Sequence, residues 1–222
     1  MNTGLFGGTF NPLHNGHIET IKYVADQFEL KQVFFIPCSI PPHKDQKNLA
    51  SAEYRFEMVK KSLKDIPNPY QFYASDIELN RTGPSYTIDT VREFKKNLSQ
   101  KDSCFLILGS DAFFEIQTWK DFKEIFGEIC VIIMLRNQEF EEEGLIEKVK
   151  SFLKKNISND YRLDNANNIF VNTDKKNIFI ANVPKINISS TMIRKNIKTG
   201  QSIKILTPHV VEKLIHEKGL YL

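Results

Sequence analysis

Residues 2–28, NTGLFGGTFNPLHNGHIETIKYVADQF, place an apolar run, a glycine pair and an amphipathic segment in immediate succession. The run Asn2–Phe6 stops at Gly7-Gly8 and predicts a buried first strand. Apolar residues then recur at three- and four-residue spacing through Gly16–Phe28, which predicts a helix. The loop between them, rich in glycine and histidine, is therefore expected at the carboxyl end of the first strand.

Strand and helix patterns continue to alternate along the chain. The further predicted strands are Gln32–Ile36, Gln71–Leu79, Cys104–Leu108 and Ile129–Leu135. The further predicted helices are about Ser51–Asp65, Thr87–Leu98, parts of Ala112–Phe126, and Met192–Ile197 after Ser189-Ser190-Thr191. This alternation predicts an α/β fold, a Rossmann-like doubly wound parallel sheet with helices on both faces.

The ends of this pattern set the expected domain organisation. The last helix is expected to have Thr207 as its N-cap, Pro208 at its first position and Gly219 just beyond its end. The segment Glu139–Lys176, acidic and then rich in Lys and Asn, is expected to be a surface helix plus a loop. Without repeats or a low-complexity linker, residues 1–222 are predicted to form a single domain, with a C-terminal helical part at about 186–222.

Charge and cysteine content exclude several classes of protein. Thirty Lys and Arg against 27 Asp and Glu give a net charge of +3, so neither a nucleic-acid partner nor a membrane surface is expected. Cys38, Cys104 and Cys130 are far apart and show no zinc-binding spacing, which favours a reducing compartment. No apolar run reaches the roughly 20 residues of a membrane span, and no secretory leader pattern is present. We expect a soluble cytoplasmic protein.

The glycine and histidine loop has the chemistry of an anion site. A glycine pair at a strand end lets backbone N–H groups approach a phosphate, and the next helix adds positive charge at its N-terminus. His14 and His17 add imidazole donors. The spacing matches neither G-x-G-x-x-G nor a Walker A sequence. The alternative, that both histidines are only helix-cap and surface residues, is less favoured for a pair in this glycine context.

Residues 7–17, GGTFNPLHNGH, resemble the (G/T)-x-x-x-P-x-x-H-x-G-H signature of the nucleotidylyltransferase superfamily, whose HxGH-like element class I aminoacyl-tRNA synthetases share. In that superfamily the two histidines hold the triphosphate of ATP and stabilise the transition state. The resemblance assigns these roles to His14 and His17. The family often has Asp where this chain has Asn11, which can be neither acid nor base, so we expect a structural turn role there.

Five further motifs in order make the chain similar to the nicotinate-nucleotide adenylyltransferase family. They are PPHK at 41–44, GPSYT at 83–87, LGSD at 108–111, TW at 118–119 and ISSTMIR at 188–194. The family's C-terminal helix also resembles the tail of this chain, whereas Glu139–Lys176 matches poorly. Taken alone, the PPHK loop could be a solvated loop, Trp119 an aromatic core anchor and Arg194 an exposed residue of a capped helix.

The resemblance implies two sets of site residues and one catalytic set. The implied catalytic residues are His14, His17, Lys44 and Arg194. The implied ATP-binding residues are Gly8, Thr9, Phe10, His17, Gly109, Asp111, Ser189, Ser190, Thr191 and Arg194. The implied mononucleotide-binding residues are Lys44, Ser85, Tyr86, Thr87, Trp119, Lys120 and Arg136.

Individual roles follow from the same resemblance. The backbone amides of Thr87 and Lys120 would receive the nicotinate carboxylate, and Trp119 would stack on the pyridine ring. The family usually has Tyr at position 120, so no side-chain role is assigned to Lys120. Asp111 would accept from ribose hydroxyls or cap a helix beginning at Ala112, and both roles could hold together. Arg194 would hold phosphate oxygens through its guanidinium.

The implied reaction is adenylyl transfer from ATP to nicotinate mononucleotide, giving deamido-NAD and pyrophosphate by direct in-line attack. Mg²⁺ is expected to arrive with ATP, held by phosphates and water, with no protein ligand set. Partners would be these small molecules alone. Alternatives are another acceptor (nicotinamide mononucleotide, phosphopantetheine or a cytidylyl acceptor) or a non-catalytic nucleotide sensor. The sequence leaves monomer and homo-oligomer equally open.

Overall fold

The structure is a computed structural model and describes residues 1–42, 48–64, 66, 69, 71–97, 102–136, 142–164 and 166–222, without the side chains of residues 136, 142 and 143. The strands are β1 (Asn2–Gly8), β2 (Gln32–Pro37), β3 (Gln71–Ala74), β4 (Ser103–Gly109), β5 (Cys130–Arg136), β6 (Arg162–Asp164), β7 (Ile169–Val171) and β8 (Ile178–Val183). The helices are α1 (Asn15–Gln27), α2 (Ala52–Lys64), α3 (Thr87–Lys96), α4 (Ser110–Glu115), the 3₁₀ helix η2 (Ile116–Thr118), α5 (Phe122–Glu128), α6 (Glu142–Asn156), α7 (Ser190–Lys198) and α8 (His209–Lys218).

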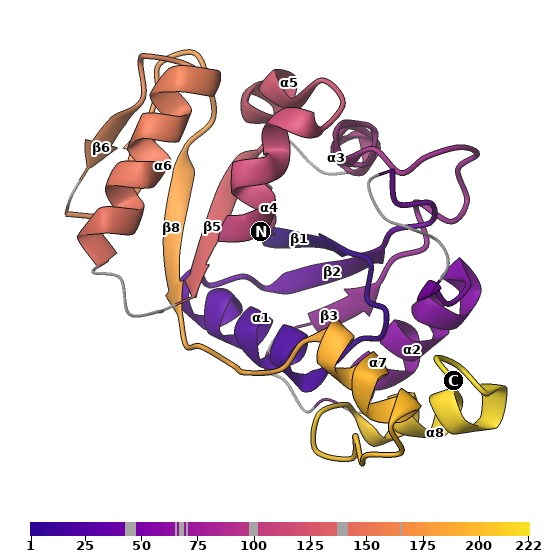
Figure 1. The fold of residues 1–222 in the computed structure, drawn as a ribbon. Helices are drawn as coiled ribbons and strands as arrows, with labels where there is room; N and C mark the ends of the chain where they lie inside the picture. Colours follow the sequence, from indigo (N-terminus) through magenta and orange to yellow (C-terminus); the bar gives the residue numbers. More distant parts are fainter. Residues whose placement is uncertain are drawn as a thin grey trace.

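Within this described part, eight strands form one sheet in the order β3-β2-β1-β4-β5-β8-β7-β6 (Figure 1). The pairs from β3 to β8 are parallel, and Leu5 of β1 lies opposite Phe34 of β2 and Leu106 of β4. Strand order reverses between β1 and β4, where the chain first runs outward through β2 and β3 and then returns. Ligands bind outside the carboxyl ends of the strands at such a switch point in open α/β sheets.

Alternate residues of the central strands face two separate apolar cores. Phe105 and Ile107 of β4 pack with the inward faces of α1 and α2. Leu106 and Leu108, their neighbours in the chain, pack with α3, α4, α5 and α6. Because both faces are covered, β4 and β5 are apolar at almost every position. The predicted doubly wound sheet with helices on both faces is confirmed.

The C-terminal helices α7 and α8 form a third, smaller core against α2. Met58 of α2 packs there with Ile193 of α7 and with Val211, Leu214 and Ile215 of α8. This packing places α7 next to the loop that follows β1 (Figure 1). Residues almost two hundred positions apart in the chain thereby share one end of the sheet.

One edge of the sheet contains antiparallel strands. The prediction for Glu139–Lys176, a surface helix plus a loop, did not include these strands. Helix α6 is present, but its Val149 and Leu153 are buried in the core under β5 and β8. After α6 the chain forms an antiparallel β6–β7 hairpin, and β7 pairs antiparallel with β8. The apolar run of β8 extends the parallel sheet beside β5. Three-residue strands in a polar segment carry little periodic signal, since their burial comes from their neighbours.

Two boundary predictions are wrong for local reasons. The strand expected over Gln71–Leu79 ends at Ala74, because the chain then turns: Leu79 and Asn80 donate backbone hydrogen bonds to the Asp76 carbonyl. The last helix begins at His209, with Pro208 as its N-cap. The Thr207 hydroxyl does not cap it but donates to the Ile203 carbonyl. Gly219 ends the helix at a φ of +59° as expected.

Among the described helices, none has the length and apolar composition that crossing a bilayer requires. Cys38, Cys104 and Cys130 are not joined to one another by disulfide bonds.

Candidate active site

Two adjoining cavities open at the carboxyl ends of β1 and β4. The first cavity, of about 710 Å³, lies between the loop after β1 and the start of α7. The second cavity, of about 340 Å³, lies between β1, β2 and the start of α3. Gly7, Gly8, Thr9 and Asp111 line both, so the two cavities adjoin at the end of β1 and the start of α4. Two ligands could meet at this shared border.

Close packing around the loop requires glycine at two positions. A Cβ on Gly8 would lie 2.8 Å from the Phe10 ring, which turns back over the strand end with a φ of +48° at Phe10. A Cβ on Gly16 would lie 3.0 Å from His14 Nδ1. The glycine of the HxGH sequence therefore makes room for the first imidazole on the first turn of α1.

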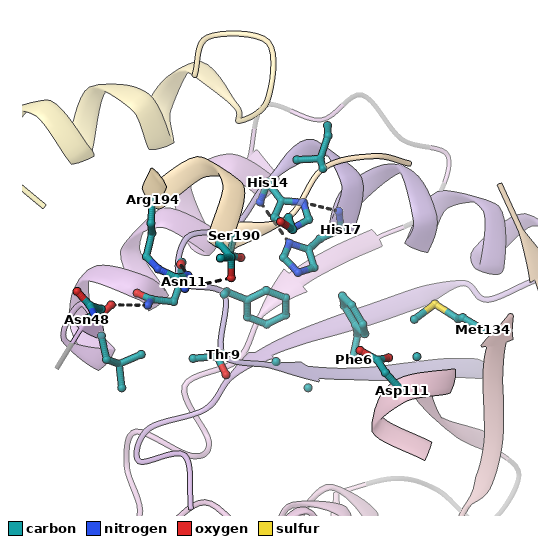
Figure 2. A pocket seen from close by; sticks show the side chains of 18 residues that line it. Phe6, Thr9, Asn11, His14, His17, Asn48, Asp111, Met134, Ser190 and Arg194 are labelled. Atoms are coloured by element: carbon teal, nitrogen blue, oxygen red, sulfur yellow. Dashed lines mark hydrogen bonds between the residues drawn. The ribbon is translucent and has the colours of Figure 1, made fainter. Parts of the chain in front are cut away.

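His14 and His17 hold each other through a reciprocal helix cap. His14 is the N-cap of α1, and its Nδ1 accepts from the His17 backbone N–H at 3.3 Å. His17 Nδ1 in turn accepts from the His14 backbone N–H at 3.3 Å. The two rings stack on each other (Figure 2), and their centroids are 3.6 Å apart. Because each Nδ1 accepts a hydrogen bond, each neutral ring carries its proton on Nε2, the nitrogen that can donate to a phosphate oxygen.

Helix α7 contributes the opposite wall of the first cavity. Ser189 caps the helix by accepting from the Met192 N–H at 3.1 Å. The Ser190 hydroxyl donates to the Pro12 carbonyl at 2.9 Å, and Arg194 donates to the Asn11 carbonyl at 2.7 Å (Figure 2). These bonds tie the N-terminus of α7 to the loop after β1. Backbone N–H groups of the first turn of a helix and an arginine together favour an anion.

Arg55 of α2 is fully buried and anchors the loops around both cavities. Its Nε donates to the Ala50 carbonyl and its two terminal nitrogens donate to the carbonyls of Thr9, Cys38 and Ser39, at distances of 2.5–2.9 Å. Burial lowers the pKa of Arg55 from its usual range. One guanidinium therefore joins the ends of β1 and β2 to the start of α2.

The second cavity has apolar and polar sides. Trp119, Leu106 and Ile36 line it together with Ser85 and Thr87. Thr87 is the first residue of α3, whose N-cap Tyr86 makes no side-chain cap, so the helix start offers backbone donors. This combination suits a flat ring that carries an anionic group.

The structure brings most of the predicted site residues together. All ten predicted ATP-binding residues line the first cavity, as does His14. Of the predicted mononucleotide-binding residues, Ser85, Thr87 and Trp119 line the second cavity, whereas Tyr86 and Lys120 do not. The Lys120 side chain instead pairs with Asp89 at 3.2 Å and lies over the Tyr86 ring. Lys44 lies outside the described residues, and Arg136 ends β5 with its side chain undescribed.

Asp111 does not cap a helix. Helix α4 begins at Ser110 with Gly109 as its N-cap, so Asp111 lies in the first turn. Its carboxylate is exposed and lines both cavities, which leaves it available to hydroxyl groups of a ligand.

Sequence reasoning missed several residues that build or line the site. The buried Glu78 lines the second cavity and accepts from the Thr90 hydroxyl at 2.7 Å. Arg55 and Tyr221 act through tertiary hydrogen bonds to the loop after β1. Arg55 left a signal, since it occupies a position on the inward face of α2 with Met58 and Val59, and Tyr221 lies in the tail that resembles the family's C-terminal helix.

Comparison with known proteins agrees with this geometry. The Cytidylyltransferase-like family model matches residues 5–196. A relative from Desulfatibacillum aliphaticivorans, named "Probable nicotinate-nucleotide adenylyltransferase", is 35% identical over 223 residues and covers 100% of both chains. A protein of the same name from Dictyoglomus thermophilum is 36% identical over 222 residues, again covering 100% of both.

A solved structure, the Plasmodium falciparum nicotinic acid mononucleotide adenylyltransferase complexed with NaAD, superposes with a TM-score of 0.72 at 20% identity, covering 99% of this chain and 97% of that one. At this identity the likeness is one of fold. By the family match, the chain belongs to the cytidylyltransferase-like family of nucleotidyltransferases. Relatives that it matches over their full length are named probable nicotinate-nucleotide adenylyltransferases.

Proposed function

We propose that this protein is a nicotinate-nucleotide adenylyltransferase that joins ATP and nicotinate mononucleotide into deamido-NAD and releases pyrophosphate. The observation that carries the proposal is the pair of adjoining cavities that share Gly7–Thr9 in their linings. The first cavity offers imidazoles, helix amides and Arg194 to a triphosphate. The second offers an aromatic side chain and a helix start to a pyridine carboxylate.

ATP would occupy the first cavity. His14 and His17 would donate their Nε2–H groups to phosphate oxygens, and Arg194 with the first turn of α7 would face them from the opposite wall. Asp111 would accept from ribose hydroxyls. Lys44 remains a predicted phosphate contact.

Nicotinate mononucleotide would occupy the second cavity. Trp119 would stack on the pyridine ring, and the backbone N–H of Thr87 would receive the carboxylate at the N-terminus of α3. Ser85 would add a polar contact, although its hydroxyl oxygen already accepts from the Ser39 N–H at 3.0 Å. Contacts from Tyr86, from the Lys120 amide and from Arg136 stay predictions.

The chemistry needs positioning and charge stabilisation more than proton transfer. The 5′-phosphate of the mononucleotide is already ionised at neutral pH, so it attacks the α-phosphorus of ATP without a general base. An oxygen–phosphorus bond forms as the bond to the leaving pyrophosphate breaks. The imidazole donors, Arg194 and the α7 amides would hold the two anions in line and stabilise the charge that gathers on the leaving group.

Nucleotidyltransferases that act on ATP generally use a divalent metal ion. We propose Mg²⁺, bound mainly by the triphosphate and water. Among the described residues no three His, Cys, Asp or Glu side chains gather into a metal site, and Mg²⁺ commonly keeps several waters and few protein ligands. When bound, the ion would supply positive charge against the phosphates.

The test is pyrophosphate release by the purified protein from ATP with nicotinate mononucleotide, compared with nicotinamide mononucleotide and phosphopantetheine. We expect turnover to be fastest with nicotinate mononucleotide. His17→Ala should lower kcat by about 10²-fold or more, because a preorganised donor is removed. His209→Ala is the matched control, since that side chain is 85% exposed on α8.

Each alternative gives a different result. Faster turnover with another acceptor would reassign the substrate of the second cavity. ATP binding without pyrophosphate release from any acceptor would indicate a nucleotide sensor. Unchanged turnover in a folded His17→Ala variant would refute the role of the histidine pair.

A further inference from the structure

The end of the chain reaches back to the loop that follows β1. The Tyr221 hydroxyl donates to Asn11 Oδ1 at 2.7 Å, across 210 positions of sequence. The Tyr221 ring packs on the edge of the C-terminal core formed by α2, α7 and α8. Tyr221 itself lines neither cavity, whereas Asn11 lines the first. The hydroxyl is therefore one residue removed from the candidate ATP site.

Asn11 connects two other segments to that hydroxyl, the stretch before α2 and helix α7. Its Oδ1 also accepts from the Ala50 N–H at 3.0 Å, and its Nδ2 donates to the Asn48 carbonyl at 2.8 Å. Its backbone carbonyl accepts from Arg194 at 2.7 Å (Figure 2). These partners fix the orientation of the amide, because only one end of it can donate. Asn11 is 8% exposed, so a lost partner is not readily replaced by water.

The hydroxyl is well suited to hold this position. A tyrosine hydroxyl is protonated at neutral pH, and burial raises the pKa of Tyr221 further, so the group is a donor here. The acceptor, Oδ1, then has two hydrogen bonds from two different segments, which use both of its lone pairs. Removing one of them leaves Asn11 free to tilt, and its carbonyl would shift relative to Arg194.

We propose that Tyr221 is a positioning residue for the ATP site, which acts through Asn11 to set the loop after β1 against Arg194. The proposal takes its ligand from the function proposed above. The C-terminal helical part thereby shapes the first cavity both directly, through α7, and indirectly, through its last tyrosine. The second cavity does not contact Asn11 and should be unaffected.

Tyr221→Phe isolates the hydroxyl, because the ring can keep its packing. The matched control is Tyr161→Phe. Tyr161 is 8% exposed and its hydroxyl donates to the Lys176 carbonyl at 2.9 Å, outside both cavities. Both variants lose one hydroxyl and one hydrogen bond. Only Tyr221→Phe should change the ATP site.

Three readouts test the proposal. Affinity for α,β-methylene-ATP, measured by calorimetry, should fall about 3- to 10-fold in Tyr221→Phe, in line with one lost hydrogen bond, and stay unchanged in Tyr161→Phe. The KM for ATP should rise by a similar factor while the KM for nicotinate mononucleotide stays constant. Amide hydrogen exchange of the peptide covering residues 8–14 should accelerate in Tyr221→Phe alone, with or without ligand.

A merely structural role would give another pattern. If both variants lowered the melting temperature alike, with analogue affinity and exchange at residues 8–14 unchanged, the proposal would be overturned. In an Asn11→Ala background, Tyr221→Phe should have no further effect on exchange or affinity. An equal effect in both backgrounds would show that the hydroxyl does not act through Asn11.

The proposed function is judged separately. Wild-type protein without pyrophosphate release would refute adenylyl transfer. The exchange measurement does not depend on a ligand and would still decide whether Tyr221 positions the loop.

Discussion

Arg55→Lys tests the claim that one guanidinium joins the loops around both cavities. Arg55 is fully buried and donates four hydrogen bonds to carbonyls of three segments. A lysine keeps the charge but has a single donor atom, so it cannot span the same carbonyls. We expect at least two of the four bonds to be lost. At about 1.5 kcal/mol for each hydrogen bond to a charged group, the lower end of the usual range, the cost is about 3 kcal/mol.

The measurement combines urea unfolding with steady-state kinetics. A loss of about 3 kcal/mol leaves a domain of typical stability, about 5–15 kcal/mol, still folded. The unfolding midpoint should drop at constant m-value, because compactness is unchanged. Since Thr9 lines both cavities, the KM values for ATP and for the mononucleotide should rise together, each severalfold.

Arg162→Lys serves as the control. Arg162 also donates to a backbone carbonyl, that of Asn159 at 2.9 Å, but at an exposed position. The reasoning fails if Arg55→Lys unfolds within about 0.5 kcal/mol of wild type, the scatter expected of surface substitutions, with both KM values unchanged.

Two further substitutions separate packing from function. Gly16→Ala should lower kcat about tenfold, because the new Cβ would press on His14 Nδ1, and it should not lower the melting temperature, because alanine favours the helix. Gly127→Ala in α5, where a Cβ meets open space, is the control. An unchanged kcat in Gly16→Ala would contradict the close-contact argument. Trp119→Ala should raise the KM for nicotinate mononucleotide about tenfold, from a stacking contribution of about 1–3 kcal/mol, and leave the KM for ATP unchanged. A loss of stability with both KM values unaltered would make Trp119 a core anchor only.

The sequence predicted the elements whose pattern is local and periodic. The apolar runs of β1, β4 and β5 and the faces of α1 and α3 follow from residues a few positions apart. The HxGH loop and the start of α7 could be placed at one sheet edge because parallel strands share a direction. Their meeting in one cavity followed from topology.

Features set by distant partners could not be predicted. The hairpin of β6 and β7 has three-residue strands whose pairing depends on β8, so its sequence is read as polar loop. The Lys120 side chain contacts Asp89 and Tyr86, and its orientation depends on these tertiary neighbours. Arg55 and Tyr221 matter through carbonyl and amide groups of the loop after β1, which no residue spacing reveals.

The border that the two cavities share at Gly7–Thr9 has a consequence for the end of a catalytic cycle. A molecule assembled across this border would be bivalent, with one half in each cavity. If one half of the product dissociated, the half still bound would keep the dissociated half at a high effective concentration and favour its rebinding. Dissociation would then require both halves of the product to be released at the same time, which would make product release the rate-limiting step of turnover.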